Sequence, residues 1–148
     1  MKRMIVILSL LSAVVIGSAQ NGNQNMFDIY ISLKDAFVKS DINQINATSL
    51  DFIEIIESIG KHNNQEVIVE TLKSIIKAKD IDKKRELFSI ISSETWSIIK
   101  NSEILNDTFY YQYCPMKKAH WISKEATIKN PYYGSKMLSC GSVSEIKN

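Results

Sequence analysis

Cysteine, proline and glycine are scarce in this chain, and their few positions are informative. The 148 residues include two cysteines, two prolines and five glycines. Between residues 26 and 101 there is no proline, and the only glycine is Gly60. Both residue types weaken helix interiors, so their scarcity favours a long helical region there. Beyond the N-terminus no apolar run approaches the roughly 20 residues that a membrane span needs.

The N-terminus has the three parts of a secretory signal peptide. Lys2 and Arg3 precede an apolar stretch over residues 4–16, and the small residues Gly17-Ser18-Ala19 follow. This order predicts a signal peptide over residues 1–19 with cleavage before Gln20. The apolar stretch is too short to remain as a membrane anchor. We therefore expect a secreted or periplasmic protein.

An excess of charge of one sign is also lacking. The chain has 18 basic and 16 acidic residues, so losing Lys2 and Arg3 with the signal peptide leaves 16 of each. Nucleic-acid-binding domains normally carry a basic excess, which argues against that class. The sequence also has no His-Glu-x-x-His motif, glycine-rich phosphate loop or nucleophile elbow. We therefore predict a binding or structural protein rather than an enzyme.

Apolar residues recur at helical spacing through the first two thirds of the chain. They predict four helices, over residues 26–40, 42–59, 64–79 and 81–100. Asp41 and Asp80 are placed to cap the second and fourth helices, and Gly60 to end the second. Short connections between helices favour antiparallel neighbours.

The last 40 residues differ in composition from the helical part. Residues 109–141 hold both prolines, both cysteines and seven of the 13 aromatic residues. Residues 109–113 suit a short extended segment, and Asn130-Pro131-Tyr132-Tyr133-Gly134 suits a turn. We predict an all-α protein of one domain. Its up-down four-helix bundle spans residues 20–108, and an irregular aromatic-rich segment, residues 109–148, packs on that bundle.

Four sulfur-containing residues stand out in this segment. Cys114 precedes Met116 by two residues, and Met137 precedes Cys140 by three. Thiolates and thioethers are the ligands that select soft ions such as Cu(I) or Ag(I). His120 lies between the two pairs and adds an imidazole suited to Zn(II) or Cu(II). The predicted metal ligands are therefore Cys114, Met116, Met137 and Cys140, with His120 as a further candidate.

The same segment carries a family resemblance. In order it holds Tyr113-Cys114-Pro115-Met116, Trp121-Ile122-Ser123, Asn130-Pro131-Tyr132-Tyr133-Gly134 and Met137-Leu138-Ser139-Cys140-Gly141. With the preceding helical region, these elements resemble a bacterial domain-of-unknown-function family. Its members are small secreted proteins, and the domain also ends periplasmic adaptor subunits of copper/silver efflux systems. The resemblance implies heavy-metal handling, envelope efflux components as partners, and metal ligation by Cys114, Met116, Met137 and Cys140. The stretch around His120 is shorter than the family pattern.

Two interpretations of the cysteines stay open at the level of sequence. In the first, the protein binds copper or silver as a buffer or an accessory to efflux. In the second, Cys114 and Cys140 form a disulfide, as two cysteines in a small secreted domain usually do. The protein is then a structural or interaction module that binds no ion, and Met116 and Met137 are packing residues.

Overall fold

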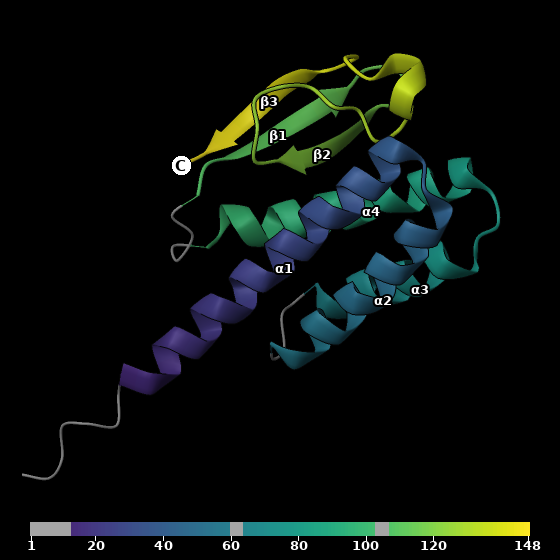
Figure 1. The fold of residues 1–148 in the computed structure, drawn as a ribbon. Coiled ribbons are helices and arrows are strands. Elements are labelled where there is room, and N and C mark those ends of the chain that lie inside the picture. Colours follow the sequence, from purple (N-terminus) through teal and green to yellow (C-terminus); the bar gives the residue numbers. More distant parts are fainter. Residues whose placement is uncertain (1–12, 60–63, 103–106) are drawn as a thin grey trace, which may run out of the picture.

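The computed structural model describes residues 13–59, 64–102 and 107–148. Four helices are followed by a small sheet (Figure 1). The helices are α1 (Ala13–Lys39), α2 (Ile42–Ser58), α3 (Gln65–Lys77) and α4 (Ile81–Lys100). The strands are β1 (Phe109–Cys114), β2 (Ala119–Ser123) and β3 (Ser142–Lys147), and a short 3-10 helix, η1 (Gly134–Met137), precedes β3.

The helical part confirms the predicted spacing and the caps at Asp41 and Asp80, whereas Gly60, predicted to end the second helix, lies outside the described residues. The carboxylate of Asp41 accepts a hydrogen bond from the Gln44 amide at 3.0 Å, and that of Asp80 accepts one from the Lys83 amide at 3.0 Å. Each bond satisfies an amide that the first turn of a helix leaves without a partner. The apolar stripes face a shared core. Its fully buried members include Leu33, Phe37, Ile45, Phe52, Ile56, Leu72, Ile75, Phe88, Ile91 and Ile99.

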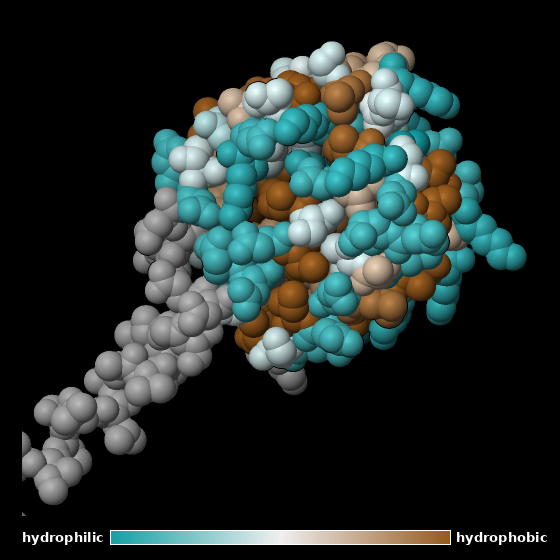
Figure 2. Space-filling model, in the orientation of Figure 1, coloured by the Kyte–Doolittle hydropathy of each residue, from teal (hydrophilic) through white to brown (hydrophobic). Residues whose placement is uncertain are grey.

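The elements stack in three layers in Figure 1, with the sheet over α1 and α4, and α2 and α3 on the far side of that helix pair. Buried residues of the helices and of the sheet belong to one hydrophobic cluster. The face shown in Figure 2 mixes hydrophilic and hydrophobic side chains.

The all-α prediction is wrong, because the C-terminal segment is a three-stranded antiparallel sheet in the order β2-β1-β3. The predicted extended segment at residues 109–113 is the central strand. β2 has five residues, too few for a clear period, and β3 is almost entirely exposed. An irregularity in the β1–β3 register, where Tyr111 pairs with Glu145 but Gln112 with Val143, also breaks the alternation of β3.

Tyr30 joins the sheet to the helices. Its buried hydroxyl accepts a hydrogen bond from the Ile122 amide of β2 at 3.1 Å and lies 2.7 Å from the Ser92 hydroxyl of α4. Burial is the main reason that the pKa of Tyr30 is raised well above its ordinary range. The phenol therefore stays neutral and links α1, α4 and β2.

Most of the predicted signal peptide lies outside the described residues, since residues 1–12 are not among them. α1 begins at Ala13 and runs past the predicted cleavage position before Gln20. In the described ranges, no helix combines the length and the apolar character that a membrane span requires.

Candidate functional site

The two cysteines come from separate segments and meet at one end of the sheet. Cys114 is the last residue of β1 and is fully buried, whereas Cys140 follows η1 and is half-buried. Both are free thiols. Burial raises the pKa of Cys140, and the neighbouring Cys114 thiol adds to this through its charge and through a hydrogen bond. The fold therefore brings the two cysteines together as neighbouring free thiols.

Two aromatic side chains, Trp121 and Tyr132, form an aromatic wall beside the thiol pair. Tyr111 of β1 faces the helices, because its ring stacks on Trp96 of α4. Side chains alternate along a strand, so Gln112 and Cys114 share a face with each other, and Trp121, which pairs with Gln112, lies on the same face, away from the helices. Trp121 is fully buried, and its ring meets the Tyr132 ring edge-on, with the centroids 6.1 Å apart. Trp121 and Tyr132 thus pack together, with Tyr132 close to Cys114, which is itself fully buried.

Gly141 allows the segment after Cys140 to pass close to the Trp121 ring. Its φ is +145°, a value that residues with a side chain rarely adopt. A Cβ at this position would lie 2.7 Å from Trp121 Cη2 and 2.7 Å from the carbonyl oxygen of Tyr113. The glycine after Cys140 therefore permits a close approach that brings Cys140 onto the end of β1.

The Asn130-Pro131 turn holds the Cys140 segment from the other side. The Asn130 side chain is fully buried, and its Nδ2 donates to the Cys140 carbonyl oxygen at 2.7 Å. Its Oδ1 accepts from the Tyr132 amide at 2.8 Å, an Asx-turn bond. The Asn130 amide donates to the Leu138 carbonyl oxygen at 2.8 Å.

The Asn130-Pro131 turn is itself anchored to the helices. Arg85 of α4 donates from Nε to the Pro131 carbonyl oxygen at 3.1 Å and from a terminal nitrogen to Ser40 Oγ at 2.9 Å. Gly134, at φ +57°, packs against the end of α1, where an added Cβ would lie 2.8 Å from Ser40 Oγ. The motif Asn-Pro-Tyr-Tyr-Gly is therefore an attachment of the C-terminal segment to the bundle.

His120 lies on the opposite face of the sheet from Cys114. It pairs with Tyr113 across the β1–β2 ladder, and its neighbour Ala119 pairs with Cys114. Its ring stacks on Tyr111, with the centroids 4.4 Å apart, and contacts Tyr113 at 4.6 Å. Trp96 of α4 continues the stack on the other side of Tyr111 at 4.6 Å. Burial lowers the pKa of His120, and nearby Glu145 only partly opposes this.

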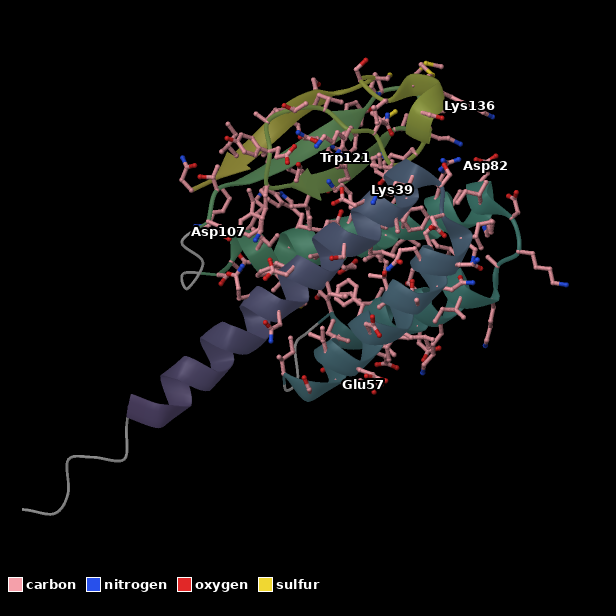
Figure 3. The ribbon with its side chains drawn as sticks, in the orientation of Figure 1. Lys39, Glu57, Asp82, Asp107, Trp121 and Lys136 are labelled. Carbon is pink, nitrogen blue, oxygen red and sulfur yellow. The ribbon has the colours of Figure 1, made fainter. Side chains whose placement is uncertain are left out.

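The two methionines differ in their surroundings. Met116 lies in the turn after β1 with 62% of its surface exposed. Met137 is half-buried in η1, and its carbonyl oxygen accepts a hydrogen bond from the Cys140 amide at 3.1 Å. Met137 therefore belongs to the same turn as Cys140. In Figure 3, sulfur atoms are visible at the η1 end of the sheet.

Residues 26–107 match a family described as Protein of unknown function (DUF3347). The chain belongs to this family. The predicted membership of an uncharacterised domain family is thereby confirmed, and the family's description names no ligand or activity. The matched residues begin in α1 and end just before β1, so they cover the helices and leave out both cysteines. No curated protein matches the chain, and no solved structure does.

The donor set of this family member suits some metals better than others. Among the described residues, no three His, Cys, Asp or Glu side chains come together as a metal site would require. Structural Zn(II) takes four nitrogen or sulfur ligands, which this site does not supply. Two thiols, with a thioether in the same turn, suit a soft ion of low coordination number.

The clamping role of Asn130 was missed at the level of sequence. The Asn-Pro step predicts a turn there, but it does not show that the amide of that turn reaches the backbone of Cys140. The signal that the sequence offered is the position of this turn between the two sulfur-containing motifs. The complete burial of Asn130 is visible only in the structure.

Proposed function

We propose that this protein binds a soft monovalent metal ion, Cu(I) or Ag(I), between Cys114 and Cys140. The observation that carries the proposal is the contact between these two thiols, one fully buried and one half-buried. Thiolate sulfur is the ligand type that such ions prefer. The aromatic wall of Trp121 and Tyr132 would shield a bound ion from water, and Met137 would be the first candidate for a third ligand.

The biological role that fits this site is a buffer or an accessory to heavy-metal efflux, without enzymatic activity. The signal-like N-terminus supports a secreted or periplasmic location, where such a protein would meet the envelope components of an efflux system. The resemblance of the Cys114 and Cys140 motifs to the C-terminal domain of copper/silver efflux adaptors supports the same role.

Competition with a chromophoric Cu(I) chelator under anaerobic, reducing conditions tests the proposal. The protein should retain one equivalent of Cu(I), and Cys114→Ser and Cys140→Ser should each abolish this retention. His120→Gln is the matched control, because the ring lies on the other face of the sheet and its loss should leave Cu(I) uptake unchanged. Equal Cu(I) uptake by Cys114→Ser would contradict the site.

The same contact supports a second candidate, a structural or interaction module closed by a Cys114–Cys140 disulfide. Oxidation of two adjacent thiols would close a loop of about 26 residues, which stabilises a fold by about 3–4 kcal/mol on the chain-entropy account. It would also tie the end of β1 to the segment anchored on the bundle. Intact mass spectrometry of untreated protein separates the two candidates, because a disulfide removes two hydrogen atoms.

A further inference from the structure

We infer that Asn130 is the positioning residue of the thiol pair: its side chain holds the Cys140 backbone over Cys114, so that the two sulfurs act as one chelate. The inference deepens the proposed function and rests on it only for the metal. The geometry of the two thiols follows from the contacts of Asn130 whether or not an ion binds.

The contacts of Asn130 are directed at both sides of one short turn. Nδ2 donates to the carbonyl oxygen of Cys140 at 2.7 Å, and the main-chain amide donates to that of Leu138 at 2.8 Å. These two carbonyls flank Ser139. Asn130 therefore makes two hydrogen bonds to the turn that carries the Cys140 thiol, and Asn130 is itself fully buried.

Asn130 takes its own position from the helices. The next residue, Pro131, accepts a hydrogen bond from Arg85 of α4. Gly134, whose amide donates to the Asn130 carbonyl oxygen at 3.1 Å, packs against Ser40 at the end of α1. Cys114, in contrast, is placed by β1. The Asn130 side chain thus ties the Cys140 backbone to a turn that the helices hold in place, on the sheet where β1 places Cys114.

The other hydrogen bonds near Cys140 do not supply this link. The Cys140 amide bonds to Met137 within its own turn. Pairing of β3 with β1 begins only at Ser142, which lies opposite Tyr113. Without the side-chain amide of Asn130, the turn would keep the main-chain bond from residue 130 to Leu138 and its connection to β3. No side chain would then hold the Cys140 carbonyl itself, and the Cys140 thiol would sample positions away from Cys114.

Exchange with glutathione measures how well the two thiols are placed. In this reaction the protein dithiol and glutathione disulfide give the protein disulfide and two molecules of glutathione: two S–H bonds of the protein are oxidised and one S–S bond is reduced. The equilibrium constant of this reaction equals the effective concentration that the Cys140 thiol presents to the Cys114 thiol. It is large when the fold holds the two sulfurs together and small when it does not. Losing a buried hydrogen bond that positions Cys140 should lower this constant by about tenfold.

The test compares Asn130→Ser with Ser123→Ala in the full chain. A serine at position 130 keeps an oxygen for the local turn but cannot reach the Cys140 carbonyl. Ser123 is the matched control: its hydroxyl accepts a local turn bond from the Glu125 amide at 3.0 Å, in the same C-terminal segment, and no described hydrogen bond joins it to Cys140. We expect the glutathione constant and the Cu(I) affinity to fall by about tenfold in Asn130→Ser only.

The outcomes distinguish the two proposals. An unchanged glutathione constant in Asn130→Ser overturns the role of Asn130, as does an equal fall in Ser123→Ala, which would indicate general loosening. Failure of the wild type to bind Cu(I) overturns the proposed function and leaves the glutathione result valid. If Asn130→Ser does not fold, Asn130→Asp keeps the acceptor for the Tyr132 amide and replaces the donor to Cys140 by a carboxylate oxygen that repels the Cys140 carbonyl, so we expect a loss of at least the same size.

Discussion

Replacing Gly141 by alanine should dislodge the segment that carries Cys140. Two costs add at this position. The φ of +145° is accessible almost only to glycine, and holding alanine there costs about 1–3 kcal/mol. The new Cβ would also lie 2.7 Å from the Trp121 ring and from a main-chain oxygen of β1, neither of which is the free end of a flexible side chain. Overpacking of this kind costs about 1–3 kcal/mol more.

We therefore expect Gly141→Ala to lower the free energy of unfolding by at least about 2 kcal/mol. Urea denaturation in reducing buffer, followed by tryptophan fluorescence, measures this change. If the segment lifts instead of the whole fold weakening, Cys114 should become accessible. Iodoacetamide labelling with mass spectrometry of the Cys114 peptide detects that release, because the thiol is fully buried in the native protein.

Ser139→Ala is the control for the substitution, since Ser139 lies in the same turn with its side chain exposed. It should change the free energy of unfolding by less than about 0.5 kcal/mol. The reasoning is refuted if Gly141→Ala also stays within about 0.5 kcal/mol of the wild type while Cys114 remains unlabelled.

Three further predictions follow from single side chains. Tyr30→Phe should cost about 1–3 kcal/mol in urea denaturation, because it leaves the buried Ile122 amide without the hydroxyl; a cost near zero would contradict the link. Burial lowers the pKa of Lys84 below 10.5, so the unfolded chain binds that proton more tightly. Stability relative to Lys84→Met should therefore rise with pH between the folded-state pKa and about 10.5, and parallel curves from pH 8 to 10 would oppose this. Cu(I) must displace the proton of Cys140, whose pKa is raised, so apparent affinity should rise by at least about tenfold per pH unit below that pKa; chelator competition at pH 6.5 and 7.5 checks it.

The helical part of the fold followed from local patterns. Steps of four, three and four residues separate Ile45, Ser49, Phe52 and Ile56. This spacing predicts a helix over residues 42–59, and α2 is Ile42–Ser58. Asp41 and Asp80 cap the helices that the sequence predicted. These features are local, since a cap and an amphipathic stripe depend on residues within a few positions of each other.

The sheet did not follow from local patterns. Aromatic content identified β1 alone, because β2 is short and β3 is exposed and irregularly paired. A strand of this kind is stabilised by its hydrogen bonds to β1 rather than by burial of its own side chains. Its partner lies about 30 residues away in the chain, so no sequence window contains the cause of its structure.

The sequence by itself determined which atoms are available for function: two thiols and two thioethers, in a segment rich in aromatic residues. Ligand chemistry is a property of each side chain and needs no fold to be recognised. Only the tertiary structure decided which of these atoms meet. It places Cys140 against Cys114 through Asn130 and the anchor on Arg85, and it turns His120 to the opposite face through the register of β1 and β2. That selection depends on pairings between distant segments, which residue spacing does not encode.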